Sequence, residues 1–344
     1  MKNLVPVAIL FYMGNVGLIV SEKPGTTKLQ SLIDAVREAV SSGLYHPGDK
    51  LPSVNELSRT AGFSRDTVVK AYQQLIQQSM VEAVPGKGYY ITSRSQKVFM
   101  LLDDFSAFKE QLYRSFRKNL PQRYSVDLLF HHYNANVFEQ LIRNAVGRYN
   151  SYLIMNLDNR KLHPVLSNLP PSRLLLVDMG YEHDTRNNFL LQNFNRATYS
   201  CLVEGLPMLK KYSDLVFVYS RQKTPHPFET RGVVRDFCIT HGFIFNETHE
   251  FNIREMRKGQ VYLVFAESDL VQVLKGCRDN GLSLGSDVGI IAYNDTPMKE
   301  IAGNGITVIS VDFTDMGKKA AQFVRQKKVV REVLPTQLIV RHSL

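Results

Sequence analysis

The stretch 51–92, LPSVNELSRTAGFSRDTVVKAYQQLIQQSMVEAVPGKGYYIT, constrains the fold more than any other part of the chain. Ser53 and Glu56 form a Ser-x-x-Glu pair, a capping pattern that predicts a helix over 54–60. A glycine turn follows, and Ser64 then predicts the start of a longer helix with one apolar face. Two helices joined by so short a turn are expected to pack against each other.

A hairpin pattern follows the second helix. Residues 81–84 and 89–92 are expected to be strands, and the Pro-Gly-Lys-Gly between them permits a tight reversal. Apolar residues at helical spacing over 27–42 predict one more helix upstream. A helix-turn-helix followed by such a wing is an arrangement that places a helix in the DNA major groove.

The first turn of the second helix carries side chains suited to DNA. The N-terminal residues of such a helix face base edges and phosphates, and Arg65 can make a bidentate contact with a guanine. Hydroxyl groups there can bind phosphate oxygens, and Lys87 at the wing tip can reach a phosphate or the minor groove. Each residue also has a simpler role as a cap, a solvated charge or a turn residue. The candidates are Ser53, Ser64, Arg65, Thr67 and Lys87.

Composition narrows the class of protein. A length of 344 residues allows two or three domains, and a formal charge of +10 favours a polyanionic partner. The cysteines Cys201, Cys238 and Cys277 are far apart and odd in number, so neither a zinc site nor a disulfide framework is expected. A reducing cytoplasm is the expected compartment.

The N-terminus is apolar over 4–20, but Pro6, Gly14, Asn15 and Gly17 interrupt the run. It is too short and too broken for a membrane span, and it lacks a good signal-peptide cleavage site. Our interpretation is that the start codon is assigned too far upstream, with Met13 as a candidate for the true start. We therefore exclude this extension from the fold. The expected layout is an extension over 1–20, a DNA-binding domain over 21–93, a linker over 94–97 and a second domain over 98–344.

The second domain alternates short apolar strands with helices. Strands are expected at 98–102, 152–156, 174–178, 215–219, 261–265 and 288–293. Helices are expected at 107–120, 137–149, 194–211, 233–241 and 270–280. This order predicts an α/β protein with parallel sheets in two lobes, and in such sheets ligands bind at the carboxyl ends of the strands.

Two resemblances follow from these motifs. The pattern LPS-x-x-EL-x-x-x-x-G-x-SR-x-TV-x-x-A…L…G-x-GY over residues 27–92 resembles the DNA-binding domain of the gluconate-repressor (GntR) family. The resemblance implies DNA contacts at Arg65 and Thr67 and makes Gly86 and Gly88 the wing glycines, Gly88 beside the DNA. Asn55 and Val69 stand where many members carry polar or basic contacts.

The stretches VYLVFAESDLVQVLKGCRDNGLSLGSDVGIIAYNDTPMKEI, ITVISVDFTDMGKKAAQFV and LPTQLIVRHSL resemble the effector domain of lactose/galactose-type (LacI/GalR) repressors, a periplasmic-binding-protein-like fold. The similarity is good over 261–344 and weaker over 97–260. By that resemblance the residues facing the ligand cleft are Phe105, Ser106, Arg231, Glu267, Ser268, Asp269, Asn294 and Asp295.

These side chains suit a sugar, because carboxylates, amides and an arginine bind vicinal hydroxyls while an aromatic ring covers the C–H face. Asp269 and Asp295 also have a simpler role, as a helix cap and a turn residue. The pair Asp103–Asp104 lacks a partner for a metal site, and no metal or cofactor is expected.

We therefore expect a cytoplasmic, ligand-responsive transcription regulator and not an enzyme. It is expected to be a homodimeric repressor that binds double-stranded operator DNA and does not contact a membrane. The expected effector is a monosaccharide, with a pentose or a deoxyhexose such as fucose as the first choice, because arabinose-type regulators share this layout. The alternative is a DNA-binding module fused to an aminotransferase-type domain that uses pyridoxal phosphate.

Overall fold

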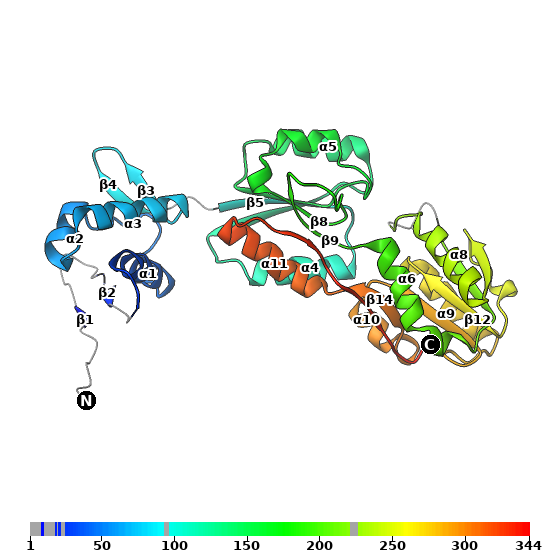
Figure 1. The fold of residues 1–344 in the computed structure, drawn as a ribbon. Coiled ribbons are helices and arrows are strands. Elements are labelled where there is room, and N and C mark those ends of the chain that lie inside the picture. The colour runs from blue at the N-terminus through cyan, green and yellow to red at the C-terminus, as the bar shows by residue number, and fades with distance from the viewer. Residues whose placement is uncertain (1–7, 10–17, 19, 22–24, 93–95, 221–225) are drawn as a thin grey trace, which may run out of the picture. The chain divides into compact units, whose positions relative to one another are not determined.

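The computed structural model describes residues 8–9, 18, 20–21, 25–92, 96–220 and 226–344 (Figure 1). The chain divides into two compact units, Met1–Ser95 and Gln96–Leu344, and each is described by itself. Residues 94 and 95 of the expected linker lie outside the described residues. Gln96 and Lys97, also expected in the linker, instead open the first strand of the second unit.

The first unit contains the helix-turn-helix and the wing that the sequence predicts. Its helices are α1 (Lys28–Ser41), α2 (Val54–Ala61) and α3 (Arg65–Gln77), and its wing strands are β3 (Val81–Val84) and β4 (Gly88–Ile91). The wing strands pair antiparallel. Helix α2 begins with a complete capping box at Ser53 and ends at Gly62, whose φ of 65° is the left-handed conformation that a glycine adopts without strain.

The core of this unit lies between the three helices and the wing. Val36, Val68 and Tyr72 are fully buried in it. Leu18 and Val20 belong to the same core, with exposed fractions of 4% and 6%. Residues 1–20 thus contribute at least these two side chains to the folded unit, and excluding the whole extension from the fold was too broad.

The first lobe of the second unit is a parallel sheet in the order β15-β9-β8-β7-β5-β6. The strands are β5 (Gln96–Leu102), β6 (Tyr124–Phe130), β7 (Ser151–Ile154), β8 (Leu174–Asp178), β9 (Asn188–Leu191) and β15 (Arg331–Val333). Helix α5 (Ala135–Ala145) covers one face, and α4 (Ala107–Lys118) and α11 (Phe313–Gln326) cover the other (Figure 1). Gly317 lets α11 approach α4, because a Cβ there would lie 2.4 Å from the Leu112 carbonyl oxygen.

The second lobe is a sheet in the order β11-β10-β12-β13-β14-β16, parallel except for β16. The strands are β10 (Asp214–Val218), β11 (Ile244–Thr248), β12 (Gln260–Val264), β13 (Val288–Tyr293), β14 (Thr307–Val311) and β16 (Thr336–Ile339). One face packs against α6 (Phe194–Glu204), α7 (Leu206–Leu209) and α8 (Thr230–His241), and the other against α9 (Glu267–Asp279). The short helix α10 (Pro297–Ile301) follows β13.

The chain passes between the lobes three times among the described residues: from β9 to α6, from β14 to α11, and from β15 to β16. The predicted strands 174–178 and 288–293 coincide with β8 and β13. The predicted helix 194–211 is two helices, α6 and α7, which meet at Gly205 with Pro207 in the first turn of α7. A proline fits the first turn of a new helix but not the interior of a continuous one.

Candidate functional site

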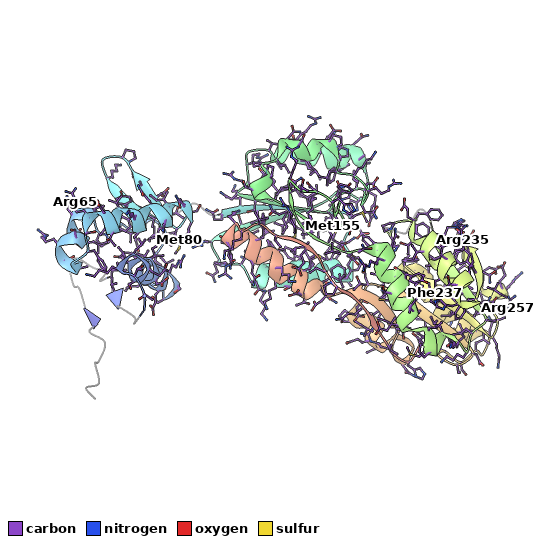
Figure 2. All side chains as sticks on the ribbon, in the orientation of Figure 1. Arg65, Met80, Met155, Arg235, Phe237 and Arg257 are labelled. Atoms are coloured by element: carbon purple, nitrogen blue, oxygen red, sulfur yellow. The ribbon has the colours of Figure 1, made fainter. Side chains whose placement is uncertain are left out.

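The start of α3 presents the side chains that the sequence assigns to DNA. Ser64 is the N-cap, and its hydroxyl oxygen accepts a hydrogen bond from the Thr67 amide (3.1 Å) and lies 2.8 Å from the Thr67 hydroxyl. Arg65 is exposed on the first turn, and among the described residues it has no hydrogen-bond or ion-pair partner (Figure 2). The guanidinium group is therefore available to an external partner, whereas the Ser64 hydroxyl also satisfies a backbone amide at the helix terminus.

The other candidates occupy the start of α2 and the wing. Ser53 caps α2, and Lys87 is exposed in the turn between β3 and β4. Gly88 has a φ of 117°, and a Cβ at this position would lie 3.2 Å from the Cε of Lys50. Lys50, which the sequence reading missed, pairs with the wing strand at Tyr90 and adds a second exposed cation beside the turn.

In the second lobe, the residues after β12 and β13 meet at the carboxyl edge of the sheet. Asp269 is buried in the first turn of α9, where the Ser220 hydroxyl donates to its carboxylate at 3.1 Å. Glu267 forms an ion pair with the buried Lys299 at 3.3 Å, and Ser268 is exposed. These neighbours hold the two carboxylates in place within the lobe.

Asn294 and Asp295 differ in their surroundings. Both oxygens of Asp295 accept from the Arg341 guanidinium, at 2.8 and 2.7 Å, so this carboxylate already has a strong partner. The side-chain oxygen of Asn294 is buried and has no hydrogen-bond partner among the described residues. The Lys299 ammonium donates to the Asn294 carbonyl oxygen at 2.7 Å and so holds this turn.

Arg231 lies on α8, where its guanidinium group donates to Glu247 of β11. It also lies over the rings of Phe228 and Phe245, with centroid distances of 6.0 and 5.8 Å. The structure thus gives this arginine an ion-pair partner and two aromatic neighbours on its own lobe. It does not bring Arg231 into the pocket described below.

In the first lobe, Phe105 and Ser106 follow β5. Phe105 is 68% exposed and packs edge-on against Phe130 at the end of β6. Ser106 precedes α4 without capping it, and its hydroxyl is buried without a partner in the described part of the chain. An exposed ring and an unsatisfied hydroxyl at one strand end are features of a site that a ligand completes.

A charged network around Asp103 and Asp104, the pair for which the sequence predicts no metal site, also follows β5. Lys109 is buried and forms ion pairs with Asp103 and Asp104. The single proton of the Tyr133 hydroxyl is shared between the two carboxylates, whose oxygens lie 2.8 and 2.9 Å from the hydroxyl oxygen. Because one lysine can neutralise only one of the two carboxylates, the edge of this lobe keeps an excess of negative charge. Among the described residues, no group of His, Cys, Asp and Glu has an arrangement that would hold a metal ion.

Two strand ends carry backbone strain. Asp178, the last residue of β8, has a φ of 62°, and Asn294, which follows β13, has a φ of 57°. Asp and Asn tolerate the left-handed region better than other side chains, but it remains costly, and such residues gather at binding sites. Burial raises the pKa of Asp178 to about 6, while the Gln192 amide that donates to it opposes the rise.

A pocket of about 300 Å³ lies where the first crossing between the lobes begins. Its walls come from the loops after β7 and β8, from the crossing itself and from the start of α6. The lining residues are Asn159, Arg160, Gly180, Tyr181, Glu182, His183, Gln192, Asn193, Phe194 and Asn195. The side-chain oxygen of Gln192 is buried there without a partner among the residues described. None of the lining residues was among the eight cleft candidates.

The lobe-two side of this pocket is rigidly built. His226 is buried, and burial lowers its pKa to about 3, so its ring is neutral. Its Nε2 lies 2.8 Å from the Thr230 hydroxyl, which in turn donates to the Asn195 side-chain oxygen at 3.0 Å. The ring of Phe194 stands edge-on to His226, with centroids 5.1 Å apart. The Asn195 side-chain nitrogen has no hydrogen-bond partner in the described part of the chain, so it can donate to a ligand.

Comparisons with known proteins agree with this division of the chain. The family described as "Bacterial regulatory proteins, gntR family" matches residues 28–91. The repressor YtrA of Bacillus subtilis (strain 168) is 33% identical over 93 residues, which are 27% of this chain and 71% of YtrA. The chain belongs to the gntR family. Its second unit has a periplasmic-binding-protein-like fold, because a domain of that description matches residues 234–344.

Two further similarities span more of the chain. The repressor MelR of B. subtilis is 19% identical over 333 residues, which are 90% of this chain and 95% of MelR. A LacI family transcriptional regulator from Lactobacillus casei, solved with bound sucrose, aligns with a TM-score of 0.59 at 13% identity over 72% of this chain and 100% of that chain. At that identity the likeness establishes the fold alone.

The chain spans only a small part of the length of two further regulators that it resembles. The match to the regulator YcxD of B. subtilis covers 16% of YcxD, and the match to YdcR of Escherichia coli covers 15% of YdcR. Among the described residues, the structure has no helix that is long and apolar enough to cross a membrane.

Proposed function

We propose that this gntR-family protein is a ligand-responsive repressor that acts in the cytoplasm. The winged helix-turn-helix binds double-stranded operator DNA as one half of a homodimer. The second unit binds a monosaccharide at the junction of its two lobes. The observation that carries the ligand assignment is the polar pocket at the first crossing, where a buried Gln192 oxygen has no hydrogen-bond partner among the described residues.

The lining chemistry favours a neutral, hydroxyl-rich ligand. Asn159, Asn193, Asn195 and Gln192 are amides, each of which both donates and accepts hydrogen bonds, as paired sugar hydroxyls require. The ring of Phe194 offers an apolar surface for the C–H face of a sugar. A volume of about 300 Å³ is at the lower end of ligand pockets, which supports one sugar ring over a longer chain.

The candidates from the sequence differ in whether their side chains are free to bind a ligand. Ser106 and Asn294 have unsatisfied polar atoms, and Phe105 is exposed, so these three have free binding capacity. Asp269, Asp295 and Arg231 already bind partners on their own lobe. None of the six lines this pocket; the first group is available to a ligand at the strand ends that carry it, and the second group supports its own lobe.

The ligand is tested by calorimetry with a panel of pentoses, deoxyhexoses, hexoses and disaccharides. We expect saturable binding of one monosaccharide that is lost in Gln192→Ala and kept in Asn252→Ala, since Asn252 precedes the short 3-10 helix Ile253–Glu255 and does not line this pocket. Binding that persists in both Gln192→Ala and Asn195→Ala would place the ligand elsewhere.

The DNA side is tested by selecting binding sequences from a random duplex pool. The recovered site is expected to be a palindrome, because two copies of α3 in a homodimer read two related half-sites. Light scattering on the purified protein measures the dimer directly. Release of the DNA on addition of the selected sugar is the expected sign of a repressor.

An enzyme remains the second candidate, in the form of a DNA-binding module fused to a domain that uses pyridoxal phosphate. The parallel two-lobed sheets and the periplasmic-binding-protein-like match over 234–344 favour the regulator instead. An absorbance scan of the protein incubated with pyridoxal phosphate separates the two, since a Schiff base with a lysine absorbs in the visible range and a free sugar site gives no such band.

A further inference from the structure

The loop after β7 is built around one buried amide. Asn156 is 2% exposed, and its side-chain nitrogen donates to the carbonyl oxygens of Asp158 and Lys161 at 2.5 and 2.7 Å. Its side-chain oxygen accepts from the backbone amide of His163 at 3.2 Å. Three hydrogen bonds from one buried residue fix the course of the loop between 156 and 163.

This loop presents Arg160 with a defined orientation. The Nε and Nη2 atoms of Arg160 donate to the two oxygens of Asp158, each at 3.1 Å, and the Arg160 amide donates to the same carboxylate at 2.8 Å. The Arg160 guanidinium beside Asp158 lowers the pKa of that carboxyl group below its ordinary value. Asp158 therefore stays ionised, and it leaves the Nη1 atom of Arg160 for another partner.

That partner belongs to the other lobe. The Nη1 atom of Arg160 lies 3.0 Å from the Oε1 atom of Glu229, the residue directly before α8. Glu229 does not cap α8 with its side chain, so its carboxylate is available for the bridge. Arg160 also lines the pocket of about 300 Å³. One side chain thus joins the two lobes at the edge of the candidate ligand site.

We propose that the Arg160–Glu229 ion pair is a clasp between the lobes that favours their closed arrangement and thereby raises the affinity for the ligand. The effect on ligand affinity rests on the proposed function, but the effect on lobe separation does not. If only the closed arrangement binds the ligand, a smaller closed population weakens the observed affinity in proportion.

The expected size of the effect is modest. The side chains of Arg160 and Glu229 are 67% and 44% exposed, and exposed ion pairs contribute little in water. We expect a shift in the closed-to-open ratio of about two- to fivefold when the pair is broken. Because salt screens such a pair, the difference between wild type and variant is expected to shrink at high ionic strength.

The test measures the lobe separation in the full chain without ligand or DNA. Spin labels at Gln140→Cys on α5 and Lys275→Cys on α9, both exposed in the wild type, report the distance between the lobes by double electron–electron resonance. The native cysteines Cys201, Cys238 and Cys277 are buried, which favours labelling at the introduced sites. Dilution of labelled with unlabelled chains removes distances between copies.

Arg160→Gln and Glu229→Gln are each expected to broaden the distance distribution and lengthen its mean, and the double variant is expected to add nothing further. The matched control is Arg143→Gln, which breaks the Arg143–Glu139 pair on α5, a pair of similar exposure (62% and 38%) inside one lobe. Urea unfolding of each variant verifies that the lobes remain folded. Additive effects of the two variants, or distances equal to those of the control, would overturn the clasp.

The ligand readout is separate. A sugar identified by the calorimetric panel is expected to bind about two- to fivefold more weakly to Arg160→Gln and with unchanged affinity to Arg143→Gln. An altered lobe distance with no ligand found would refute the proposed function and leave the clasp standing. An unaltered lobe distance with a tightly bound sugar would refute the clasp and leave the function standing.

Discussion

Replacing Asp178 with Asn is expected to stabilise the second unit at neutral pH and to have a much smaller effect in acid. Asp178 is 5% exposed at the end of β8, and burial raises the pKa of its carboxyl group from 3.8 to about 6. Its folded pKa therefore lies above its unfolded pKa. The folded state binds the proton more tightly than the unfolded state. The contribution of protonated Asp178 to the free energy of unfolding is therefore fully present below about pH 4 and is lost as the pH rises through about 6.

The difference of about two pKa units corresponds to roughly 3 kcal/mol at most, since one unit is about 1.4 kcal/mol. An asparagine keeps the oxygen that accepts from Gln192 and carries no charge. Urea unfolding of the full chain, followed by circular dichroism at pH 4 and at pH 7.5, measures the two free energies of unfolding. We expect the difference in free energy of unfolding between Asp178→Asn and wild type to be about 1–3 kcal/mol more favourable to the variant at pH 7.5 than at pH 4.

Asp287→Asn is the control of opposite sign. The Ser283 amide and the Lys258 ammonium lower the pKa of Asp287 below its ordinary value of 3.8, so its removal is expected to destabilise the protein at both pH 7.5 and pH 4, because this contribution is lost only as the pH falls through the lowered folded pKa. Asparagine also adopts the left-handed conformation more readily than aspartate, and relief of that strain does not depend on pH. An equal gain for Asp178→Asn at both pH values would therefore assign the effect to the backbone and refute the buried-charge argument.

Three further outcomes are expected. Arg65→Ala is expected to weaken operator binding about 10- to 100-fold in a gel-shift titration with the fold unchanged, because one bidentate base contact contributes about 1–3 kcal/mol; equal affinity would remove Arg65 from the interface. Removing residues 1–20 deletes the buried side chains of Leu18 and Val20 and is expected to lower the stability of the first unit by roughly 3 kcal/mol in thermal unfolding; an unchanged unfolding transition would show that neither side chain stabilises the core. Asp295→Ala leaves Arg341 without its bidentate partner and is expected to lower the free energy of unfolding by about 1.5–3 kcal/mol. The ligand affinity of the folded molecules is expected to be unchanged. A selective loss of ligand affinity would return Asp295 to the binding site.

The sequence predicted the elements whose signal is local. The capping box at Ser53 and the apolar runs of β8 and β13 are patterns that one stretch of chain carries by itself. Strands β6 and β11 were missed because they form edges of their sheets and are only partly buried, with Asp127 and Glu247 inside them. A polar residue in a short strand makes it resemble a loop when no neighbour is known.

The candidate site was predicted less well, because its chemistry depends on pairing across the chain. Sequence could assign Asp295 to a strand end, but not its bond to Arg341, which is 46 residues away. Lys109 was expected on the helix 107–120, and nothing local indicated that it is buried against two carboxylates. The pocket residue Asn193 lies in a crossing that sequence alone did not locate. The best available signal was the amide-rich run QNFN that follows β9.

The position of the pocket connects ligand binding to lobe movement. Gln192 and Asn193 lie in one of the connections between the lobes, so a ligand held there contacts the segment that must bend when the lobes move. The first unit precedes β5, a strand of the first lobe, along the chain, and in the proposed homodimer a change in lobe angle would reach the DNA-binding unit through this strand. A typical coupling of about 1–3 kcal/mol would suffice to alter operator affinity 5- to 150-fold. The clasp at Arg160 acts on this same angle, and breaking it is therefore expected to shift operator affinity in the direction opposite to the sugar.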